Sequence, residues 1–216
     1  MRSKPEIMSL LTNPGIIAVV RAPKAEQVLP LSEALIAGGV IAVEITTTTP
    51  NAVEAIRKAT QQIGSRAVIG IGTVLDAPTC RAALEAGAEF VVSPILRPEL
   101  VALCHAADRP VMLGAYTPTE AQLAHEAGAD FIKIFPSDGL GPNYIKAIRA
   151  PLPHLRIIPT GIANVDDVAG FITAGCVGVG LGSLLITRQI LQEANWPELT
   201  RRAREFVAVV HKARGK

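Results

Sequence analysis

Eight short apolar segments recur along the 216-residue chain, and this recurrence constrains the fold more than any other feature of the sequence. Each segment is predicted to form a β-strand, because it is short, apolar and bounded by turn residues. The segments span residues 16–21, 42–46, 67–73, 90–94, 111–115, 131–136, 156–161 and 178–183. Between them lie stretches of about 12 to 20 residues with the apolar spacing of an amphipathic helix. Strands and helices are therefore expected to alternate along the whole chain.

Proline and glycine mark the ends of the expected helices. Proline suits the first helical turn, where its missing N–H is no loss, and six prolines follow predicted strands at such places: Pro23, Pro50, Pro78, Pro98, Pro118 and Pro142. Thr117 to Glu120 has the pattern of a capping box, and Thr49 and Asp76 are expected helix N-caps. Four Ala-Gly pairs are expected to end helices with a left-handed glycine; their glycines are Gly38, Gly87, Gly128 and Gly175.

The alternation predicts an α/β fold, and the number of strand–helix units favours a (β/α)8 TIM barrel. An open doubly wound sheet, which usually has about five to seven strands, is the alternative fold. No composition shift marks a domain boundary, so a single barrel domain is expected over residues 1–216. A short N-terminal helix over residues 2–12 is expected to cover the bottom of the barrel. The chemistry of such a barrel belongs at the C-terminal ends of its strands.

Charge, hydropathy and cysteine usage exclude several classes of function. A formal net charge of +2 gives no reason to expect nucleic acid as a partner, since nucleic-acid binding usually leaves a basic face. No apolar run approaches the roughly 18 to 20 residues that a membrane span needs. The three cysteines lie far apart and the four histidines show no ligand spacing, so we expect neither a disulfide framework nor a metal site. A reducing cytoplasm is the expected location.

Two charged residues fall on strand positions that should face the barrel interior. Strand side chains alternate, so Lys133 shares a face with Phe131 and Phe135, while Ile132 and Ile134 suit the helix-facing side. The same alternation in residues 42–46 places Glu44 inside with Thr46. An unpaired ammonium would be costly there, so we expect Lys133 and Glu44 to lie together.

This pair has a structural and a chemical interpretation. A buried ion pair occurs in folded proteins, but it is weak evidence for stability because desolvation can exceed the Coulombic gain. In the chemical interpretation, burial favours the neutral amine of Lys133, which can attack a ketone and form a Schiff base. Glu44 would then move protons to and from the carbinolamine and the carbon beside the imine.

Six motifs that follow one another along the chain carry a resemblance to a known family. They are Glu44-Ile-Thr, Gly70-Ile-Gly-Thr-Val74, Val92-Ser-Pro94, Lys133-Ile-Phe-Pro136, Pro159-Thr-Gly161 and Gly180-Leu-Gly-Ser183. In this order and spacing they resemble the 2-dehydro-3-deoxyphosphogluconate (KDPG) and 4-hydroxy-2-oxoglutarate (KHG) aldolases, over roughly residues 14–211. The resemblance implies a class I lyase that uses neither metal nor cofactor and is commonly a homotrimer. It also implies a keto acid substrate and a role in carbohydrate metabolism, as in the Entner–Doudoroff pathway.

The same resemblance assigns roles to individual residues. It implies that Lys133 is the Schiff-base lysine, Glu44 the general acid/base and Thr73 the hydrogen-bond partner of the pyruvate carboxylate. Pro94 and Phe135 are expected to shape the pocket around the methyl end of pyruvate, although each taken alone could be a turn proline or a core phenylalanine.

A second set of residues is expected to bind the distal end of the substrate. Backbone N–H groups after the last two strands of a barrel often hold phosphate, and here those loops contain Thr160, Gly161, Ile162, Gly182 and Ser183. Arg21 ends the first predicted strand. It could meet a carboxylate or phosphate of the substrate, or form a surface ion pair.

Two positions depart from the pattern of the gluconate-acting members. Where those members often carry an arginine four residues after the catalytic glutamate, this chain has Thr48, so the carboxylate contact must come from Thr73, backbone amides or Arg21. Where the family usually has a second glycine in the phosphate loop, this chain has Ile162, which would be strained if that position needs a positive φ. Residues 133–146 resemble the galactonate-acting branch.

The expected reaction is retro-aldol cleavage of a 2-keto-3-deoxy-6-phospho sugar acid to pyruvate and glyceraldehyde 3-phosphate. Cleavage of 4-hydroxy-2-oxoglutarate to pyruvate and glyoxylate is a second candidate, and 2-dehydro-3-deoxy-6-phosphogalactonate is an alternative substrate. Two rival classes stay open. One is a phosphate-binding barrel isomerase or synthase that needs no imine-forming lysine, and the other is a non-catalytic barrel that binds a sugar acid.

Overall fold

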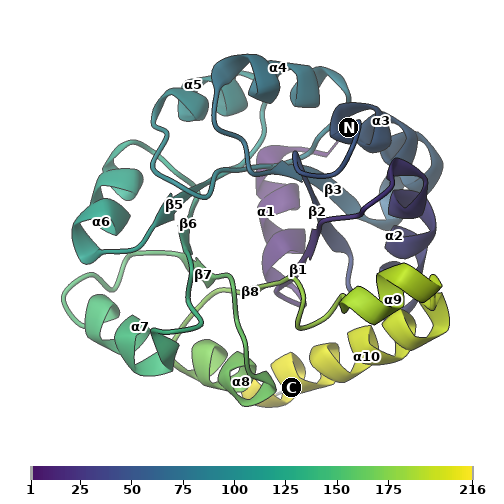
Figure 1. The fold of residues 1–216 in the computed structure, drawn as a ribbon. Helices are drawn as coiled ribbons and strands as arrows, with labels where there is room; N and C mark the ends of the chain where they lie inside the picture. Colours follow the sequence, from purple (N-terminus) through teal and green to yellow (C-terminus); the bar gives the residue numbers. More distant parts are fainter. Residues whose placement is uncertain (1, 216) are drawn as a thin grey trace.

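The computed structural model describes residues 2–215 and shows eight parallel strands curled into a barrel with helices outside (Figure 1). The strands are β1 (Ile16–Val20), β2 (Ala42–Thr46), β3 (Val68–Gly72), β4 (Val91–Val92), β5 (Val111–Ala115), β6 (Phe131–Ile134), β7 (Ile157–Pro159) and β8 (Val179–Leu181). Their order in the sheet is β7-β6-β5-β4-β3-β2-β1-β8, and a bridge between Thr160 and Gly180 joins the two edge strands. The predicted (β/α)8 barrel is confirmed, and the open sheet is wrong.

Helices surround the barrel in the order that the alternation predicts. They are α1 (Lys4–Thr12), η1 (Ala25–Gln27), α2 (Val28–Ala37), α3 (Ala52–Ile63), η2 (Gly64–Arg66), α4 (Ala77–Glu85), α5 (Glu99–Ala106), α6 (Pro118–Glu126), α7 (Gly141–Arg149), α8 (Val165–Thr173), α9 (Arg188–Glu193) and α10 (Trp196–Ala213). The long helix α10 packs against α2 and α8 on the outside of the barrel (Figure 1). Within the described part of the chain, no helix is both long and apolar enough to cross a membrane.

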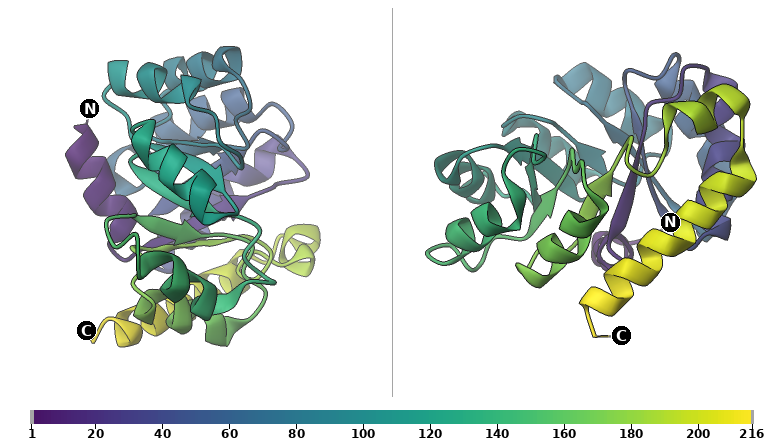
Figure 2. Two further views of the ribbon diagram at one scale, coloured as in Figure 1. Left: turned by 90° about the vertical axis from the view of Figure 1, so that its left-hand side faces the viewer. Right: turned by 60° about the horizontal axis from the view of Figure 1, so that its bottom comes forward.

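The N-terminal helix covers one end of the barrel, as predicted. Ile7 and Leu11 of α1 are buried and join the apolar cluster that fills the barrel interior, together with Ala42 and Phe131. In the left-hand view of Figure 2, α1 lies at one end of the barrel and α9, which follows the C-terminal end of β8, lies at the other. The end of the barrel near α9, where the strands have their C-termini, is therefore the expected place of the active site.

Strand alternation places side chains in two separate clusters. Val43, Ile45, Ile132 and Ile134 pack with the helices in the larger cluster, whereas the inward positions of β2 and β6 contribute to the interior cluster. This partition is the one expected from the period-2 pattern. By the same alternation, Glu44 and Lys133, two residues after Ala42 and Phe131, also point into the barrel.

Two of the predicted N-caps are present. The Thr117 hydroxyl accepts a hydrogen bond from the N–H of Glu120, and the Glu120 carboxylate accepts from the N–H groups of Tyr116 and Thr117. These bonds, led by the one from Tyr116, lower the pKa of Glu120. Asp76 caps α4 by accepting from the N–H of Thr79 at 2.8 Å.

Other helix-end predictions are wrong. Pro23 and Pro50 lie before the N-caps of η1 and α3, outside the first helical turn. At the end of α2 the left-handed residue is Gly39 with φ +89°, whereas Gly38 remains right-handed, because α2 ends one residue later than the Ala-Gly pattern implies. At the start of α3 the N-cap is Asn51 and not Thr49. The Thr49 hydroxyl instead accepts a hydrogen bond from the N–H of Ala22 at 3.2 Å, which ties the ends of β1 and β2 together.

Candidate active site

Lys133 of β6 and Glu44 of β2 meet inside the barrel. The distance from Lys133 Nζ to Glu44 Oε1 is 3.5 Å, and the two side chains are 3% and 2% exposed. The strands that carry them are not neighbours in the sheet, so the contact crosses the barrel interior. The two sequence-predicted residues are therefore brought together, as the inward register of both strands requires.

The Glu44 carboxylate is incompletely satisfied in this environment. Its Oε1 atom is buried and accepts no hydrogen bond from any described group. Buried polar atoms nearly always have a hydrogen-bond partner, and an exception in a barrel mouth indicates a group that is free to act on a ligand. Apart from its ion pair with Lys133, Oε1 can thus accept a proton or a hydrogen bond from a bound molecule.

Inward-facing glycines provide the space for this carboxylate. A Cβ on Gly72 of β3 would lie 2.5 Å from both Cγ and Cδ of Glu44, closer than any real contact. Gly70, the register partner of Glu44, would meet the Phe90 ring in the same way. The Glu44 side chain consequently lies over bare backbone at the end of β3.

Phe135 lies beside the lysine amine, and Pro94 lies against the neighbouring strand β5. Lys133 Nζ is 5.5 Å from the centroid of the Phe135 ring, within the range of a cation–π contact. The Pro94 backbone packs against Gly114 of β5, and Gly114 pairs in register with Lys133. The Phe135 ring also reaches Gly161, where an added Cβ would be 3.4 Å away. The Phe135 ring is therefore close to the amine, and Pro94 lies against the strand next to Lys133.

Thr73 follows directly after Gly72 and has a left-handed backbone, with φ +61°. A β-branched residue in this region is an outlier that costs energy and is typically found where the surrounding structure enforces it. Because the Glu44 side chain lies over Gly72, Thr73 lies beside the carboxylate in space. The periodicity of the sequence does not indicate this backbone conformation.

A cavity of about 600 Å³ opens between the ends of β1, β2 and β8. Its lining includes Val19, the register partner of Glu44, but neither Glu44 nor Lys133. The lining contains five polar or charged residues, Arg21, Thr48, Ser183, Arg188 and Gln192. No acidic side chain lines it, and neither arginine forms an ion pair with any described residue. Such a cavity suits an anion. Arg188 was missed by the sequence analysis, since nothing in the local pattern after Ser183 shows that it turns back toward β1.

Arg21 is oriented by a chain of threonine hydroxyls. Thr46 Oγ1 donates to the carbonyl of Val20 at 3.0 Å, so the 2.7 Å contact between Thr46 and Thr48 is donated by Thr48. Thr48 Oγ1 then accepts from Arg21 Nη1 at 3.0 Å. Only one N–H of the guanidinium is used here, and the others remain available to a ligand. Among residues 2–215, Arg21 has no acidic partner, so the surface ion pair considered for it is not found there.

The loop after β7 is held without strain at Ile162. Gly161 has φ +81°, whereas Ile162 is buried and does not have a positive φ. The left-handed position is therefore the glycine, and the strain considered for isoleucine does not arise. Thr160 is buried, and its carbonyl accepts hydrogen bonds from the hydroxyl and the N–H of Ser137 at 2.6 and 3.0 Å. The Ser137 hydroxyl thus donates its proton to the backbone of Thr160 and not to a ligand.

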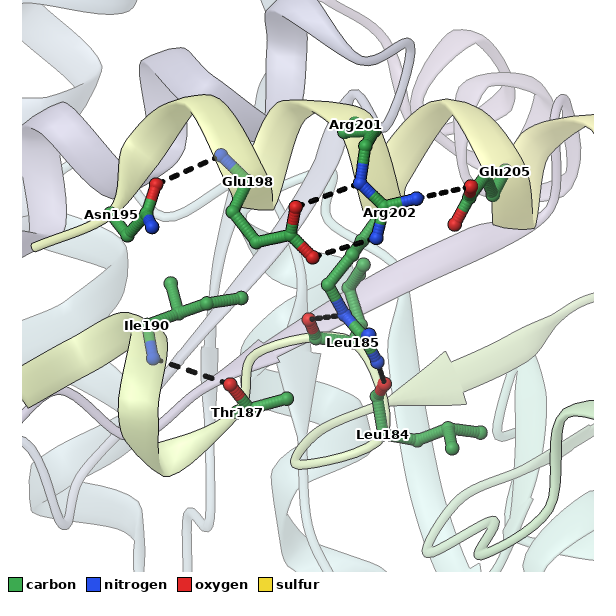
Figure 3. Close-up of polar contacts among 9 residues, drawn as sticks. All are labelled: Leu184, Leu185, Thr187, Ile190, Asn195, Glu198, Arg201, Arg202 and Glu205. Carbon is green, nitrogen blue, oxygen red and sulfur yellow. Dashed lines mark hydrogen bonds and ion pairs between the residues drawn. The ribbon is translucent and has the colours of Figure 1, made fainter. Parts of the chain in front are cut away.

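The loop that follows Ser183 is anchored by α10 (Figure 3). Arg202 donates to the carbonyl oxygens of Leu184 and Leu185, and Thr187 caps α9 by accepting from the N–H of Ile190. These contacts fix the chain on both sides of the turn between β8 and α9. They hold Ser183 and Arg188 on the rim of the same cavity. Among residues 2–215, no group of three His, Cys, Asp or Glu side chains could hold a metal ion.

Comparison with known proteins gives consistent matches over nearly the whole chain. The family model described as "Aldolase: KDPG and KHG aldolase" matches residues 7–202. A 2-dehydro-3-deoxy-phosphogluconate aldolase of Pseudomonas aeruginosa is 32% identical over 92% of this chain and 90% of its own length. A 2-dehydro-3-deoxy-6-phosphogalactonate aldolase of Escherichia coli is 36% identical over 82% of this chain and 86% of its own.

Among solved structures, the chain resembles a KDPG aldolase from Legionella pneumophila, described with pyruvate captured at low pH as a covalent carbinolamine intermediate. The TM-score is 0.84 and the sequence identity 26%, over 93% of this chain and 97% of that one. The similarity therefore extends to the barrel as a whole.

Proposed function

Since the chain belongs to the KDPG and KHG aldolase family and is thus a carbon–carbon lyase, we propose a specific reaction for it. The enzyme cleaves a 2-keto-3-deoxy-6-phospho sugar acid through a Schiff base on Lys133. The products are pyruvate and glyceraldehyde 3-phosphate. The observation that carries the proposal is the buried contact of Lys133 Nζ with Glu44 Oε1, an oxygen atom that has no hydrogen bond. A lysine that can pass a proton to a neighbouring carboxylate is the arrangement that imine chemistry needs.

In the first half of the reaction, the neutral amine of Lys133 adds to C2 of the keto acid. One amine proton moves to the C2 oxygen to give the carbinolamine. The protonated Glu44 carboxyl then donates a second proton to the leaving hydroxyl, so that water departs and the protonated imine remains. The Glu44 carboxylate lies 3.5 Å from Nζ, so it can take this proton from the Lys133 ammonium before the attack, which leaves the amine neutral.

In the second half, Glu44 removes the proton of the C4 hydroxyl. The C4–O bond becomes the aldehyde, the C3–C4 bond breaks, and its electron pair neutralises the imine nitrogen as an enamine. Glu44 then returns the proton to C3, and water hydrolyses the imine to pyruvate and free Lys133. Atoms balance without a cofactor, because the imine itself is the electron acceptor.

The pyruvate half of the substrate is placed by residues around the amine. Thr73, beside the Glu44 carboxylate, donates to the substrate carboxylate, while Phe135 and Pro94 flank the methyl end. The surfaces next to Lys133 are apolar on the Phe135 side, which suits the carbon that becomes the methyl group of pyruvate.

The distal phosphate occupies the cavity beside β8. Arg21 and Arg188 supply two positive charges there, and Ser183 supplies a hydroxyl and backbone at the turn after Gly182. A phosphate dianion gains more binding energy from two unpaired guanidinium groups than the distal carboxylate of 4-hydroxy-2-oxoglutarate, which carries a single charge. Phosphorylated substrates are therefore preferred, and 4-hydroxy-2-oxoglutarate is a weaker substrate. Gly161 and Ile162 do not line this cavity, and Gly161 lies against the Phe135 ring instead.

The galactonate-type substrate is a second candidate. It is favoured by the similarity to the E. coli galactonate aldolase and by Thr48, which leaves the anion contact on that side to Arg21. The two sugar acids differ at one stereocentre, so the choice between them depends on contacts at C4.

We also propose that the protein is a cytoplasmic homotrimer that acts in the Entner–Doudoroff type of sugar-acid breakdown. The family resemblance supports the trimer. So do three exposed apolar side chains after neighbouring strands, Leu75, Ile95 and Tyr116, each more than two-fifths exposed. A patch of this kind favours contact with another subunit.

One assay distinguishes the candidate substrates and tests the role of Lys133. Pyruvate release is measured for the gluconate-type, galactonate-type and hydroxyoxoglutarate substrates under identical conditions, with Lys133→Ala as the inactive reference. Cleavage of at least one phosphorylated acid by the wild type alone supports the proposal. If wild type and Lys133→Ala release pyruvate equally, or neither does, the non-catalytic barrel replaces it.

A further inference from the structure

Thr73 occupies a backbone conformation that its own residue type disfavours. Its φ of +61° is left-handed, and for a β-branched residue that conformation persists only where neighbouring groups enforce it. Alternation along β3 puts Gly70 and Gly72 inside, so an uninterrupted strand would turn residue 73 toward the helices. The left-handed residue interrupts this alternation at the position beside the Glu44 carboxylate.

The neighbouring β2–α3 loop supplies the enforcing contacts, and both come from Thr47. The N–H of Thr47 donates to the carbonyl of Gly72 at 2.9 Å. The Thr47 hydroxyl donates to the carbonyl of Thr73 at 3.0 Å. On the other side, the N–H of Val74 donates to the carbonyl of Val92 at 3.1 Å.

These three hydrogen bonds determine the conformation of Thr73. The φ and ψ of a residue are the relative rotations of the two peptide planes that flank it. The Gly72–Thr73 plane is held by the Thr47 N–H, and the Thr73–Val74 plane is held by the Thr47 hydroxyl and by Val92. One residue, Thr47, therefore holds both planes.

We propose that Thr47 is a positioning residue of the aldolase, which clamps Thr73 in its left-handed conformation so that Thr73 can receive the carboxylate of the pyruvate moiety. This inference rests on the proposed function. Thr47 lies three residues after Glu44 on the same chain segment. The clamp thus fixes the spacing between the general acid/base of β2 and the carboxylate partner at the end of β3.

The variant Thr47→Val tests the clamp by removing the hydroxyl and keeping the branched shape and the N–H. We expect the Michaelis constant for the sugar acid, and the pyruvate concentration that half-saturates borohydride trapping, to rise about threefold to tenfold, the range of one lost hydrogen bond. The turnover number should change less, because Lys133 and Glu44 are untouched. Thr47→Ser restores the hydroxyl and should recover most of the affinity.

A double-mutant cycle separates positioning from a general structural role. In a Thr73→Ala background there is no side chain left to position, so adding Thr47→Val should cost no further affinity for pyruvate. Thr200→Val is the matched control, since its hydroxyl makes a similar 2.9 Å bond to the carbonyl of Ala34, on the outside of the barrel. That control should leave pyruvate affinity unchanged. If Thr47→Val does not fold, Thr47→Ala takes its place in the cycle.

The outcomes distinguish the clamp from the function on which it rests. If the wild type forms no reduced pyruvyl adduct, the proposed function fails and the clamp fails with it. If the wild type forms the adduct but Thr47→Val binds pyruvate as tightly, the clamp alone is wrong. It is also wrong if the losses of Thr47→Val and Thr73→Ala simply add, or if Thr47→Ser recovers nothing.

Discussion

Gly72 lies directly beneath the side chain of Glu44, so close that a single methyl group on Gly72 would occupy the space of the carboxylate. A Cβ there would lie 2.5 Å from both Cγ and Cδ of Glu44. The absence of a side chain at one strand position thus determines where the acid of the neighbouring strand can sit. It lets Oε1 lie 3.5 Å from Lys133 Nζ.

Gly72→Ala should therefore impair catalysis by displacing Glu44. The turnover number should fall about 100-fold or more, the lower range of a general acid/base contribution. The measurement is steady-state pyruvate release together with circular dichroism to verify the fold. Gly139→Ala is the control, because a Cβ there meets nothing within 4 Å. Equal turnover in Gly72→Ala and wild type would show that the carboxylate need not occupy this position.

Glu44→Gln keeps the shape of the side chain and removes its ability to take up a proton. Imine formation with pyruvate should become slower, and the turnover number should fall about 100-fold to 10,000-fold. Rapid-quench borohydride trapping separates the two effects, because it reports the imine alone. A Glu44→Gln variant with wild-type turnover would assign proton transfer to another group.

Arg188→Gln tests the proposed phosphate cavity. Removing one of two guanidinium groups should raise the Michaelis constant for a phosphorylated acid about tenfold or more, the range of a hydrogen bond to a charged group. The constant for 4-hydroxy-2-oxoglutarate should change much less. Arg81→Gln is the control, since Arg81 is exposed on α4 and does not line the cavity. An equal effect on both substrates would place the phosphate elsewhere.

The alternation of strands and helices was sufficient to predict the barrel, because the two-residue period of strands and the period of about 3.6 residues of helices determine which face of each element is buried. It also placed Lys133 and Glu44 in one interior, since both fall on inward positions of their strands. The 90–94 segment shows the limit of this reasoning, because only Val91–Val92 pairs as a strand there. The chain leaves the sheet at Ser93 and Pro94, and the Pro94 backbone packs against Gly114 of β5.

Other features of the site could not be predicted from local patterns. The left-handed backbone of Thr73 depends on the hydrogen bonds from Thr47, which belongs to a different strand–helix unit. The role of Arg188 depends on a turn that α10 holds through Arg202. Both require contacts between residues far apart in the sequence, and these appear only when the barrel closes.

Cys176 gives a prediction about stability at high pH. Burial raises the pKa of its thiol to about 12. In the unfolded chain the thiol ionises near its usual value of about 8.5, so above that pH the unfolded state loses a proton that the folded state keeps. Stability should thus fall as pH rises from about 9 to 11, by roughly 1.4 kcal/mol per unit for this group.

Urea unfolding of wild type and Cys176→Ala at several pH values checks this prediction. The wild type should lose more stability than the variant across the window from about pH 9 to 11, because only the wild type has this thiol. Parallel stability curves for the two proteins would contradict the assignment of a raised pKa to Cys176.

The central claim is that Lys133 forms a Schiff base with a keto acid, and the most direct measurement is reductive trapping. The protein is incubated with pyruvate and sodium borohydride, digested, and analysed by mass spectrometry. The account predicts one reduced pyruvyl group, located on Lys133, and none in Lys133→Ala. An unmodified protein, or an adduct on any other lysine, would contradict it.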